Sequence, residues 1–456
     1  MNTCLLNIPY HTRIIRRYSC TYYAPNFLFP PLELMYLGSI IKEWKKGDAV
    51  LIDAIAERIN LNNIIKRIKE YQPNLLVFMA GLESFYEDIR IITTIKSYFA
   101  SLKTACIGYL PSIFPRETLE NNPAIDYVIM NEPEISFSEI YDEIKNGNLS
   151  EAPIKGVAKR YNGKIILGEE RPRIKDLDIL PFPDRSLIRQ RLYNEFLLKK
   201  PFTVIQASRG CPFECTYCIR TYGREVAFRS VSNILSEIEE AILKYKIEVI
   251  RFTDDTFTLD RARVVELCDS ILKRGFKFQW SALSRIDKID RETLSLMKKA
   301  GCKRLYLGIE SGSQRILDFY KKGYKADVTR DKLKMIKENN IEAVGFFMVG
   351  GIQTEAEFRQ DISLAKKLRL DYVIVEKVTP YPGTPLFSYT KDTGLQERTS
   401  KWEKVFYREF YLRPKYLLNK YKDFIFNING VLLAMSRLLG YLLFRQASDL
   451  SRREMI

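Results

Sequence analysis

Three cysteines stand close together at Cys211, Cys215 and Cys218, with three and then two residues between them. Thiolates are the usual protein ligands of iron–sulfur clusters, and three of them can hold three irons of a four-iron cubane. The fourth iron then has no protein ligand, so a small molecule can bind it. The motif therefore predicts a reactive [4Fe–4S] cluster, because a cluster with four cysteine ligands would serve as an electron carrier.

Other interpretations of the motif are weaker. A structural zinc site usually draws on two well-separated ligand pairs, and no second pair is present here. A secreted disulfide framework would be denser in cysteine and would need an export signal, which the first residues do not resemble. We therefore expect a reducing, cytoplasmic location. The other cysteines are isolated, at Cys4, Cys20, Cys106, Cys268 and Cys302.

The motif follows the first strand of a strand–helix series over residues 201–385. Short apolar runs predict the strands, and apolar residues at every third or fourth position predict the helices. Six strand–helix units suit an open, partial (βα)6 TIM-like barrel. The predicted strands are Thr203–Ala207, Val249–Thr253, Lys277–Ala282, Arg304–Ile309, Ala343–Val349 and Tyr372–Val378. The predicted helices are Val231–Tyr245, Arg261–Lys273, Arg291–Ala300, Thr329–Glu338 and Glu355–Leu368.

An earlier series over residues 1–150 alternates in the same way, which predicts an α/β, Rossmann-like (flavodoxin-like) domain with a parallel sheet covered on both faces. Such sheets bind ligands beyond the carboxyl ends of their strands. Residues 151–200 are predicted to be a connector with one hairpin and a proline-rich stretch, and residues 386–456 a helical C-terminal region. The predicted strands of the first series are Cys4–Ile8, Ala49–Asp53, Leu75–Met79, Thr104–Ile107 and Tyr127–Ile129.

Several motifs resemble one enzyme family over about 380–400 residues. The cysteine segment Arg209–Cys218 resembles the signature of the radical S-adenosylmethionine (SAM) superfamily. Four later segments resemble its branch with an N-terminal cobalamin-binding domain: Phe252–Thr258, Gly308–Gly312, Val349–Gly351 and Thr379–Thr384. The resemblance implies reductive cleavage of SAM at the cluster, which yields a 5′-deoxyadenosyl radical. It also implies an electron donor such as ferredoxin or flavodoxin.

These motifs all follow predicted strands, whose carboxyl ends gather at one face of a parallel barrel. By the resemblance, SAM would chelate the open iron through its amine and carboxylate. Glu310 would accept hydrogen bonds from a ribose hydroxyl or the amine, and Arg285 would pair with the carboxylate. Gly350 would let the backbone approach the adenosyl group.

Asp254 and Asp255 are the remaining candidates, expected to orient the SAM amine or the substrate. Each candidate carboxylate also has a structural alternative. Glu310 could be a surface carboxylate, and the two aspartates could cap the helix predicted to follow them, over Leu259–Lys273.

The resemblance extends to the cobalamin-binding domain through Phe29–Leu37, Val50–Ala54 and Asp126–Ile129. Two positions depart from it, because Tyr109 follows Gly108 where paired glycines are common, and a proline separates two later acids. The motif that supplies a histidine ligand to cobalt is absent around His11. We expect bound cobalamin without histidine ligation; the alternative is a vestigial domain kept for packing or substrate.

The net charge of +16 favours anionic partners such as nucleic acid, a membrane face or phosphorylated substrates, although a lysine-rich surface explains it equally. Residues 424–444 are apolar with a central Arg437, which predicts an interfacial helix or one packed on the barrel. Family members that resemble this chain include hopanoid methylases and tetraether-lipid ring-forming enzymes. We therefore expect modification of an unactivated carbon of a hydrophobic, lipid-type substrate, with possible peripheral membrane contact. The alternatives are RNA or peptide modification, or a non-catalytic cobalamin or iron–sulfur protein.

Overall fold

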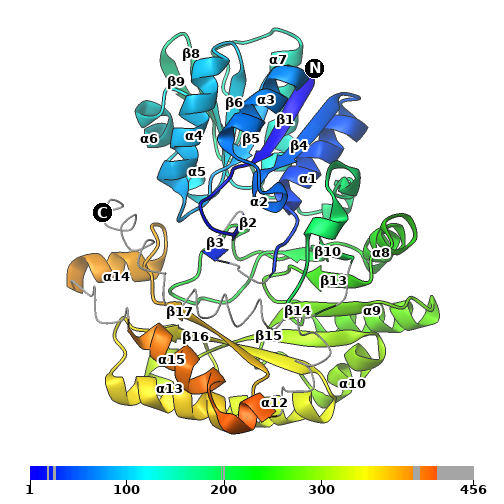
Figure 1. Ribbon diagram of the computed structural model, residues 1–456, viewed down its shortest axis with the longest axis vertical. Helices are drawn as coiled ribbons and strands as arrows, with labels where there is room; N and C mark the ends of the chain where they lie inside the picture. The colour runs from blue at the N-terminus through cyan, green and yellow to red at the C-terminus, as the bar shows by residue number, and fades with distance from the viewer. Residues whose placement is uncertain (18–19, 24–26, 197, 199–200, 394–400, 419–456) are drawn as a thin grey trace. The chain divides into compact units, whose positions relative to one another are not determined.

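The computed structural model describes the chain except residues 18–19, 24–26, 197, 199–200, 394–400 and 419–456. The described chain forms two compact units, Met1–Thr203 and a second that begins at Val204. Each unit has its own sheet and core, and each is described here by itself (Figure 1).

The first unit has a seven-stranded sheet in the order β4-β1-β5-β6-β7-β8-β9. The strands from β4 to β7 are parallel, whereas β8 and β9 pair antiparallel. The bounds are β1 Asn2–Asn7, β4 Asp48–Asp53, β5 Leu75–Met79, β6 Lys103–Ile107, β7 Tyr127–Ile129, β8 Val157–Tyr161 and β9 Lys164–Leu167. The predicted connector hairpin is therefore the antiparallel edge of this sheet. A separate hairpin, β2 Ile14–Arg17 and β3 Cys20–Tyr23, was not predicted.

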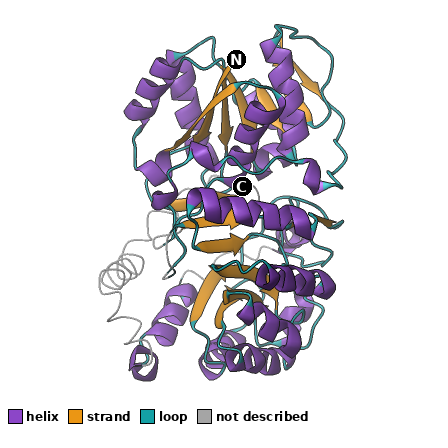
Figure 2. Cartoon of the chain, turned by 90° about the vertical axis from the view of Figure 1, so that its right-hand side faces the viewer, coloured by secondary structure: helices purple, strands orange, loops and turns teal. Residues whose placement is uncertain are grey.

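Helices cover both faces of this sheet (Figure 2). The side chains along its strands therefore point alternately into two separate cores. In β5, Leu76 and Phe78 pack with α3 and α4 on one face, whereas Leu75, Val77 and Met79 pack with α1 and α7 on the other. The helices are α1 Leu32–Ser39, the π-helix η1 Ile40–Trp44, α2 Ala54–Glu57, α3 Leu61–Tyr71, α4 Phe85–Tyr98, α5 Tyr109–Ile113, α6 Pro115–Asn121 and α7 Pro133–Lys145. Three short 3₁₀ turns follow, at Leu177–Ile179, Arg185–Leu187 and Gln190–Leu192.

The second unit has a six-stranded sheet in sequence order, β10-β13-β14-β15-β16-β17. Sequential parallel neighbours joined by helices give the open barrel that the sequence predicts. The strands are β10 Phe202–Ile205, β13 Val249–Phe252, β14 Gln279–Arg285, β15 Cys302–Glu310, β16 Glu342–Val349 and β17 Tyr372–Lys377. The helices are α8 Val231–Tyr245, α9 Arg261–Lys273, α10 Arg291–Lys299, α11 Gln314–Phe319, α12 Val328–Glu338, α13 Glu355–Lys367, α14 Pro385–Thr393 and α15 Trp402–Tyr411.

Helix α15 covers the open edge strand β17. The hydroxyls of Tyr407 and Tyr411 accept hydrogen bonds from the backbone N–H groups of Val375 and Val373, at 2.9 and 3.0 Å. Phe406 and Phe410 of the same helix are fully buried in the barrel core.

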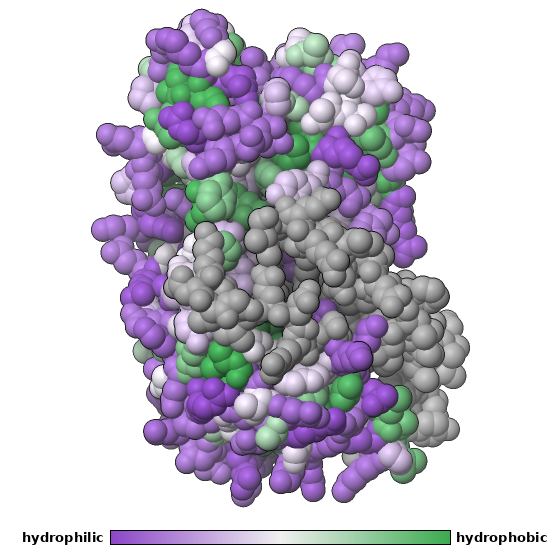
Figure 3. Space-filling model, turned by 90° about the vertical axis from the view of Figure 1, so that its left-hand side faces the viewer, coloured by the Kyte–Doolittle hydropathy of each residue, from purple (hydrophilic) through white to green (hydrophobic). Residues whose placement is uncertain are grey.

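The described surface visible in Figure 3 is mostly hydrophilic, as expected for a chain with well-buried cores. Within the described residues, no helix combines the length and apolar character needed to cross a bilayer. The interfacial helix expected over residues 424–444 lies outside the described residues.

Candidate active site

The three motif cysteines lie on the loop between the short strands β11 Ser208–Arg209 and β12 Ala227–Phe228. Cys215 is buried, Cys211 is partly exposed and Cys218 is exposed. The loop turns at Gly210, whose φ is 95°, and a Cβ there would lie 2.1 Å from the Glu225 carbonyl oxygen, so only glycine fits. The loop is anchored at Thr216, whose N–H donates to the Tyr320 carbonyl at 3.1 Å.

The donor chemistry of this loop fits an iron–sulfur cluster. Three thiols on one loop supply soft ligands, and no fourth cysteine lies in the motif. As they stand, the described side chains are not gathered closely enough to enclose a metal ion. Burial raises the pKa of the Cys211 thiol, with the Asp255 carboxylate adding to the effect. A bound metal would favour the thiolate over the thiol.

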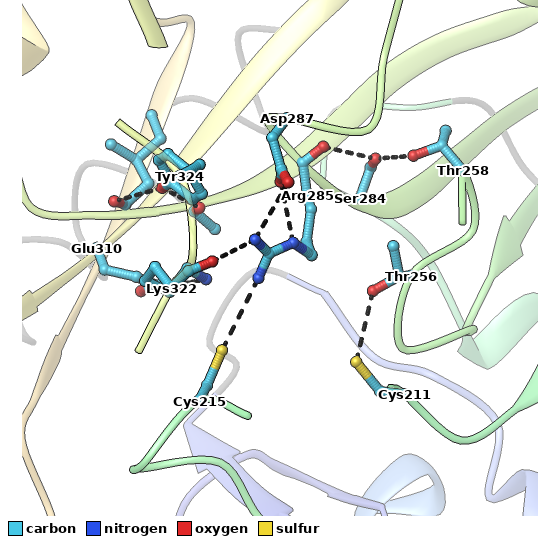
Figure 4. Close-up of polar contacts among 12 residues, drawn as sticks. Cys211, Cys215, Thr256, Thr258, Ser284, Arg285, Asp287, Glu310, Lys322 and Tyr324 are labelled. Atoms are coloured by element: carbon cyan, nitrogen blue, oxygen red, sulfur yellow. Dashed lines mark hydrogen bonds and ion pairs between the residues drawn. The ribbon is translucent and has the colours of Figure 1, made fainter. Parts of the chain in front are cut away.

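Arg285 ends β14 and reaches the cysteine loop (Figure 4). Its guanidinium lies 3.7 Å from the centre of the Phe213 ring, and Nη1 lies 3.9 Å from Cys215 Sγ. The side chain also makes two hydrogen bonds to the Asp287 carboxylate, at 2.9 and 3.2 Å, and donates to the Lys322 carbonyl. The guanidinium edge expected to bind a SAM carboxylate is thus already paired with Asp287.

Glu310 ends β15 in a left-handed conformation, with φ of 63°. Its Oε1 accepts hydrogen bonds from the Tyr217 hydroxyl at 2.8 Å and from Lys322 Nζ at 3.0 Å. Glu310 and Lys322 are both buried, so the surface-carboxylate alternative is wrong. A Cβ on Gly308 would lie 2.6 Å from Glu310 Oε1, so this glycine leaves room for the pair. Sequence reasoning missed Lys322, since it follows a helix rather than a strand.

The two aspartates after β13 differ sharply. Asp254 is buried, and its carboxylate accepts hydrogen bonds from the Ala207 N–H at 3.2 Å and from the Ser208 hydroxyl, which fixes the end of β10. Burial raises the pKa of Asp254 to about 6. Asp255 is exposed and lies near the cysteines, where its charge raises the pKa of Cys211. Neither residue caps the next helix, because Asp260 does.

Gly350 follows β16 with φ of 103° and belongs to a buried polar network. Its N–H donates to the Gln353 side chain at 3.2 Å, and Gln353 donates in turn to Asp361 at 2.6 Å. Asp361 also accepts from the Ser311 hydroxyl at 2.9 Å, so α13 ties the glycine turn to the segment after Glu310. Burial raises the pKa of Asp361 to about 7.

The strand ends of the first unit carry a second buried polar network. Asp53 accepts hydrogen bonds from Asn7 Nδ2 at 2.9 Å and from the Tyr193 hydroxyl at 2.8 Å. Arg16, from the unpredicted hairpin, donates to Asn7 at 3.2 Å and forms an ion pair with Asp88 at 2.6 Å. The side chains of this ion pair are fully buried.

Small residues follow the two central strands of that sheet. Ala80 and Gly81 come after β5, and Gly108 comes after β6 with φ of 142°. A Cβ on Gly108 would lie 2.5 Å from the Ala80 carbonyl oxygen. The backbone after β5 therefore occupies the space beside Gly108, and this glycine allows the two strand ends to approach closely. Tyr109, the bulky departure, is buried at the start of α5, and His11 lies beside Glu87 at 3.4 Å.

Comparison with known proteins finds relatives that match both units. Residues 205–365 match the radical SAM superfamily. The uncharacterized methyltransferase PH0819 of Pyrococcus horikoshii is 32% identical over 429 residues, which cover 89% of this chain and 92% of that protein. The anaerobic magnesium-protoporphyrin IX monomethyl ester cyclase of Cereibacter sphaeroides is 24% identical over 372 residues, covering 80% of this chain and 61% of that protein.

A solved structure shares the architecture of both units. The radical SAM methyltransferase TsrM from Kitasatospora setae, solved with cobalamin and a [4Fe-4S] cluster, has a TM-score of 0.68 and 16% identity. The similarity covers 88% of this chain and 82% of that one. It confirms the predicted fold class, a Rossmann-like domain followed by a partial barrel.

Proposed function

The chain belongs to the radical SAM superfamily, in the branch with an N-terminal cobalamin-binding domain, and from this we propose that it modifies an unactivated carbon of its substrate. Cys211, Cys215 and Cys218 hold the [4Fe–4S] cluster, and SAM binds beside it. The observation that supports this most directly is the convergence of Arg285 and the Glu310–Lys322 pair on the cysteine loop from the ends of neighbouring strands.

When bound, the reduced cluster and SAM supply a 5′-deoxyadenosyl radical and methionine; the protein orients and shields the reactants. Glu310 accepts a hydrogen bond from the SAM amine or ribose in place of its present donors. Lys322 remains as a buried cation suited to the SAM carboxylate. Gly350 lets backbone approach the adenosyl group, and Asp254 holds the end of β10 where the cysteine loop begins. Asp255, which is exposed, orients the substrate.

The primary test is anaerobic purification followed by iron and sulfide analysis and reaction with dithionite and SAM. We expect about four irons per chain and formation of 5′-deoxyadenosine. Cys215→Ala should abolish both. Cys302→Ala, which changes a buried cysteine outside the loop, is the matched control and should keep both. A full cluster and SAM cleavage in Cys215→Ala would exclude the cysteine loop as the cluster site.

The first unit supplies the cobalamin site, at the ends of β5 and β6. The similarity to a structure solved with cobalamin supports this site, as does its position at the carboxyl ends of parallel strands, where such sheets bind ligands. Methyl transfer needs cobalamin, whereas radical ring closure need not. A cobalamin absorption spectrum and transfer of isotopic methyl from SAM to product would favour methylation; ring formation without label would favour cyclisation.

The substrate is a hydrophobic molecule of lipid type. One relative, by its name, acts on magnesium-protoporphyrin IX monomethyl ester. Comparative lipid profiling of a deletion strain identifies the missing product. Unchanged lipids together with altered RNA or peptide modification would transfer the proposal to those substrates.

The C-terminal residues 419–456 provide peripheral membrane contact. Truncation after Leu418 retains Tyr416, whose hydroxyl donates to the Asp371 carbonyl at 2.7 Å, so the barrel contact is kept. The truncated enzyme should cleave SAM but lose sedimentation with anionic liposomes, and the binding of the full chain should weaken as salt rises. A full chain that ignores liposomes at low salt would contradict membrane contact.

A further inference from the structure

Two of the three motif thiols have a polar side chain next to the sulfur, but only one of these side chains donates to it (Figure 4). Arg285 Nη1 lies 3.9 Å from Cys215 Sγ, and the Thr256 hydroxyl lies 3.8 Å from Cys211 Sγ. The thiol of Cys218 contacts a backbone carbonyl, that of Ile219, at 3.5 Å. The three sulfurs therefore have different surroundings: one has a cationic donor, one has a hydroxyl whose proton is donated to the Asp255 carbonyl at 2.8 Å, and one has a backbone carbonyl.

The position of Arg285 is fixed by more than the cysteine contact. The side chain is buried, with 5% of its surface exposed, and its guanidinium lies over Phe213 in the cysteine loop. The Asp287 carboxylate accepts hydrogen bonds from Nε and Nη2 of the guanidinium group, and the Lys322 carbonyl also accepts from Nη2. These contacts leave Nη1 directed at Cys215, as Figure 4 shows.

We propose that Arg285 sets the reduction potential of the cluster by donating a hydrogen bond to the Cys215 sulfur. The inference rests on the proposed function, because it requires Cys215 to be a cluster ligand. Hydrogen bonds to the sulfurs, net charge and exposure are what tune the potentials of such clusters.

The sign follows from charge. Reduction adds one electron from an external one-electron donor of the ferredoxin or flavodoxin class, taking the cluster from the 2+ to the 1+ state with no bond made or broken. The electron increases negative charge on the sulfurs, so a cationic donor stabilises the reduced state and raises the potential. Asp287 opposes this, because its carboxylate neutralises part of the Arg285 charge.

The experiment is a redox titration of the cluster-loaded full chain, without SAM, followed by the electron paramagnetic resonance signal of the reduced cluster. For Arg285→Gln we expect the equilibrium constant for reduction to fall about tenfold, or about 59 mV toward negative potential for a one-electron couple. Arg285→Lys, which retains the charge without the fork, should shift less. Thr256→Val, which removes a hydroxyl that donates to Asp255 and not to Cys211, should leave the potential unchanged, and Asp287→Asn should give a positive shift.

Lys273→Gln is the control for loss of one positive charge, since Lys273 is exposed in the last turn of α9. Its potential should match that of the wild type. An unchanged potential in Arg285→Gln, with four irons retained, overturns the inference while leaving the proposed function intact. If Arg285→Gln loses its cluster, Asp287→Asn decides: a positive shift supports the inference and no shift overturns it. A wild-type chain that assembles no cluster overturns the proposed function itself.

Discussion

The two parallel sheets of this chain both collect polar residues at the carboxyl ends of their strands, yet they use them differently. In the first unit, Asn7, Asp53 and the Arg16–Asp88 pair bond to one another and to Tyr193, forming a closed network. In the second unit, Arg285 and Thr256 lie beside thiols. Parallel topology therefore determines where polar groups gather, and their local partners determine whether a ligand can use them.

The prediction with the largest expected effect tests whether the buried polar network of the first unit is structural. Arg16→Ala would leave the Asp88 carboxylate buried without its cationic partner, which costs about 3–5 kcal/mol when a buried pair is broken. We expect a corresponding loss in the free energy of unfolding by urea, with iron content unchanged in the protein that remains folded. Arg90→Ala, an exposed arginine on α4, is the control. Equal free energies of unfolding for the two variants would mean that the buried Arg16–Asp88 pair stabilises the fold no more than an exposed arginine does.

A prediction of intermediate size tests whether the polar residues at the strand ends of the second unit are available to a ligand. Glu310→Ala removes a charged acceptor, and hydrogen bonds to charged groups contribute about 1.5–3 kcal/mol. SAM affinity, measured anaerobically by calorimetry, should fall by that amount while the cluster stays intact. Glu292→Ala, at a highly exposed side chain of the same unit, should bind SAM normally. An unchanged dissociation constant in Glu310→Ala would remove Glu310 from the site.

The smallest effect concerns the pH dependence of stability at Asp361. Burial raises its pKa from 3.8 to about 7, so the folded chain binds an extra proton between these values. The stability that this proton gives is present below pH 3.8 and is lost as pH rises toward 7. Urea unfolding from pH 4 to 8 should therefore show a decline in the wild type that is smaller in Asp361→Asn, where Asp254, whose pKa is raised to about 6, still contributes.

Glu357, on the same helix, provides a control of opposite sign. Arg315 holds the pKa of Glu357 at about 2, below its usual 4.5, so its contribution is present above pH 4.5 and is lost as pH falls toward 2. Glu357→Gln should therefore lower stability at neutral pH and leave the decline at pH 4 to 7 in place. A decline of unchanged size in Asp361→Asn would assign it to other groups, such as Asp254.

Much of the fold could be predicted from the sequence, because buried parallel strands are apolar runs bounded by turns. The predictions for β5 and β7 agree with their observed bounds, and Glu310 lies at the end of β15, near where the predicted strand stopped. Partners were harder to predict. Lys322 lies in the loop after α11, Asp361 lies on α13 and Arg16 lies in a hairpin. Their order along the chain does not show which strand end each of them contacts.

Arg285 illustrates the same limit at short range. Its position at the end of a strand was predictable, but its pairing with Asp287, two residues ahead, depends on the turn of the backbone after β14. Because of that turn, Asp287 pairs with the guanidinium group, and the remaining nitrogen, Nη1, is directed toward Cys215. Residue type alone suggested that Arg285 binds the carboxylate of SAM. The local conformation instead provides a carboxylate from the chain itself, that of Asp287.

An open barrel ends in a strand with unpaired backbone groups, and here the two tyrosines of α15 act as a substitute for a seventh strand. Residues four apart on a helix are separated by about 6 Å along its axis, and residues two apart on a strand by about 6.6 Å. The spacing of Tyr407 and Tyr411 therefore matches that of Val375 and Val373, although one element is helical and the other extended. A strand from another chain has no free register to join there, so the same contact that limits the barrel to six strands also protects it from edge-to-edge aggregation.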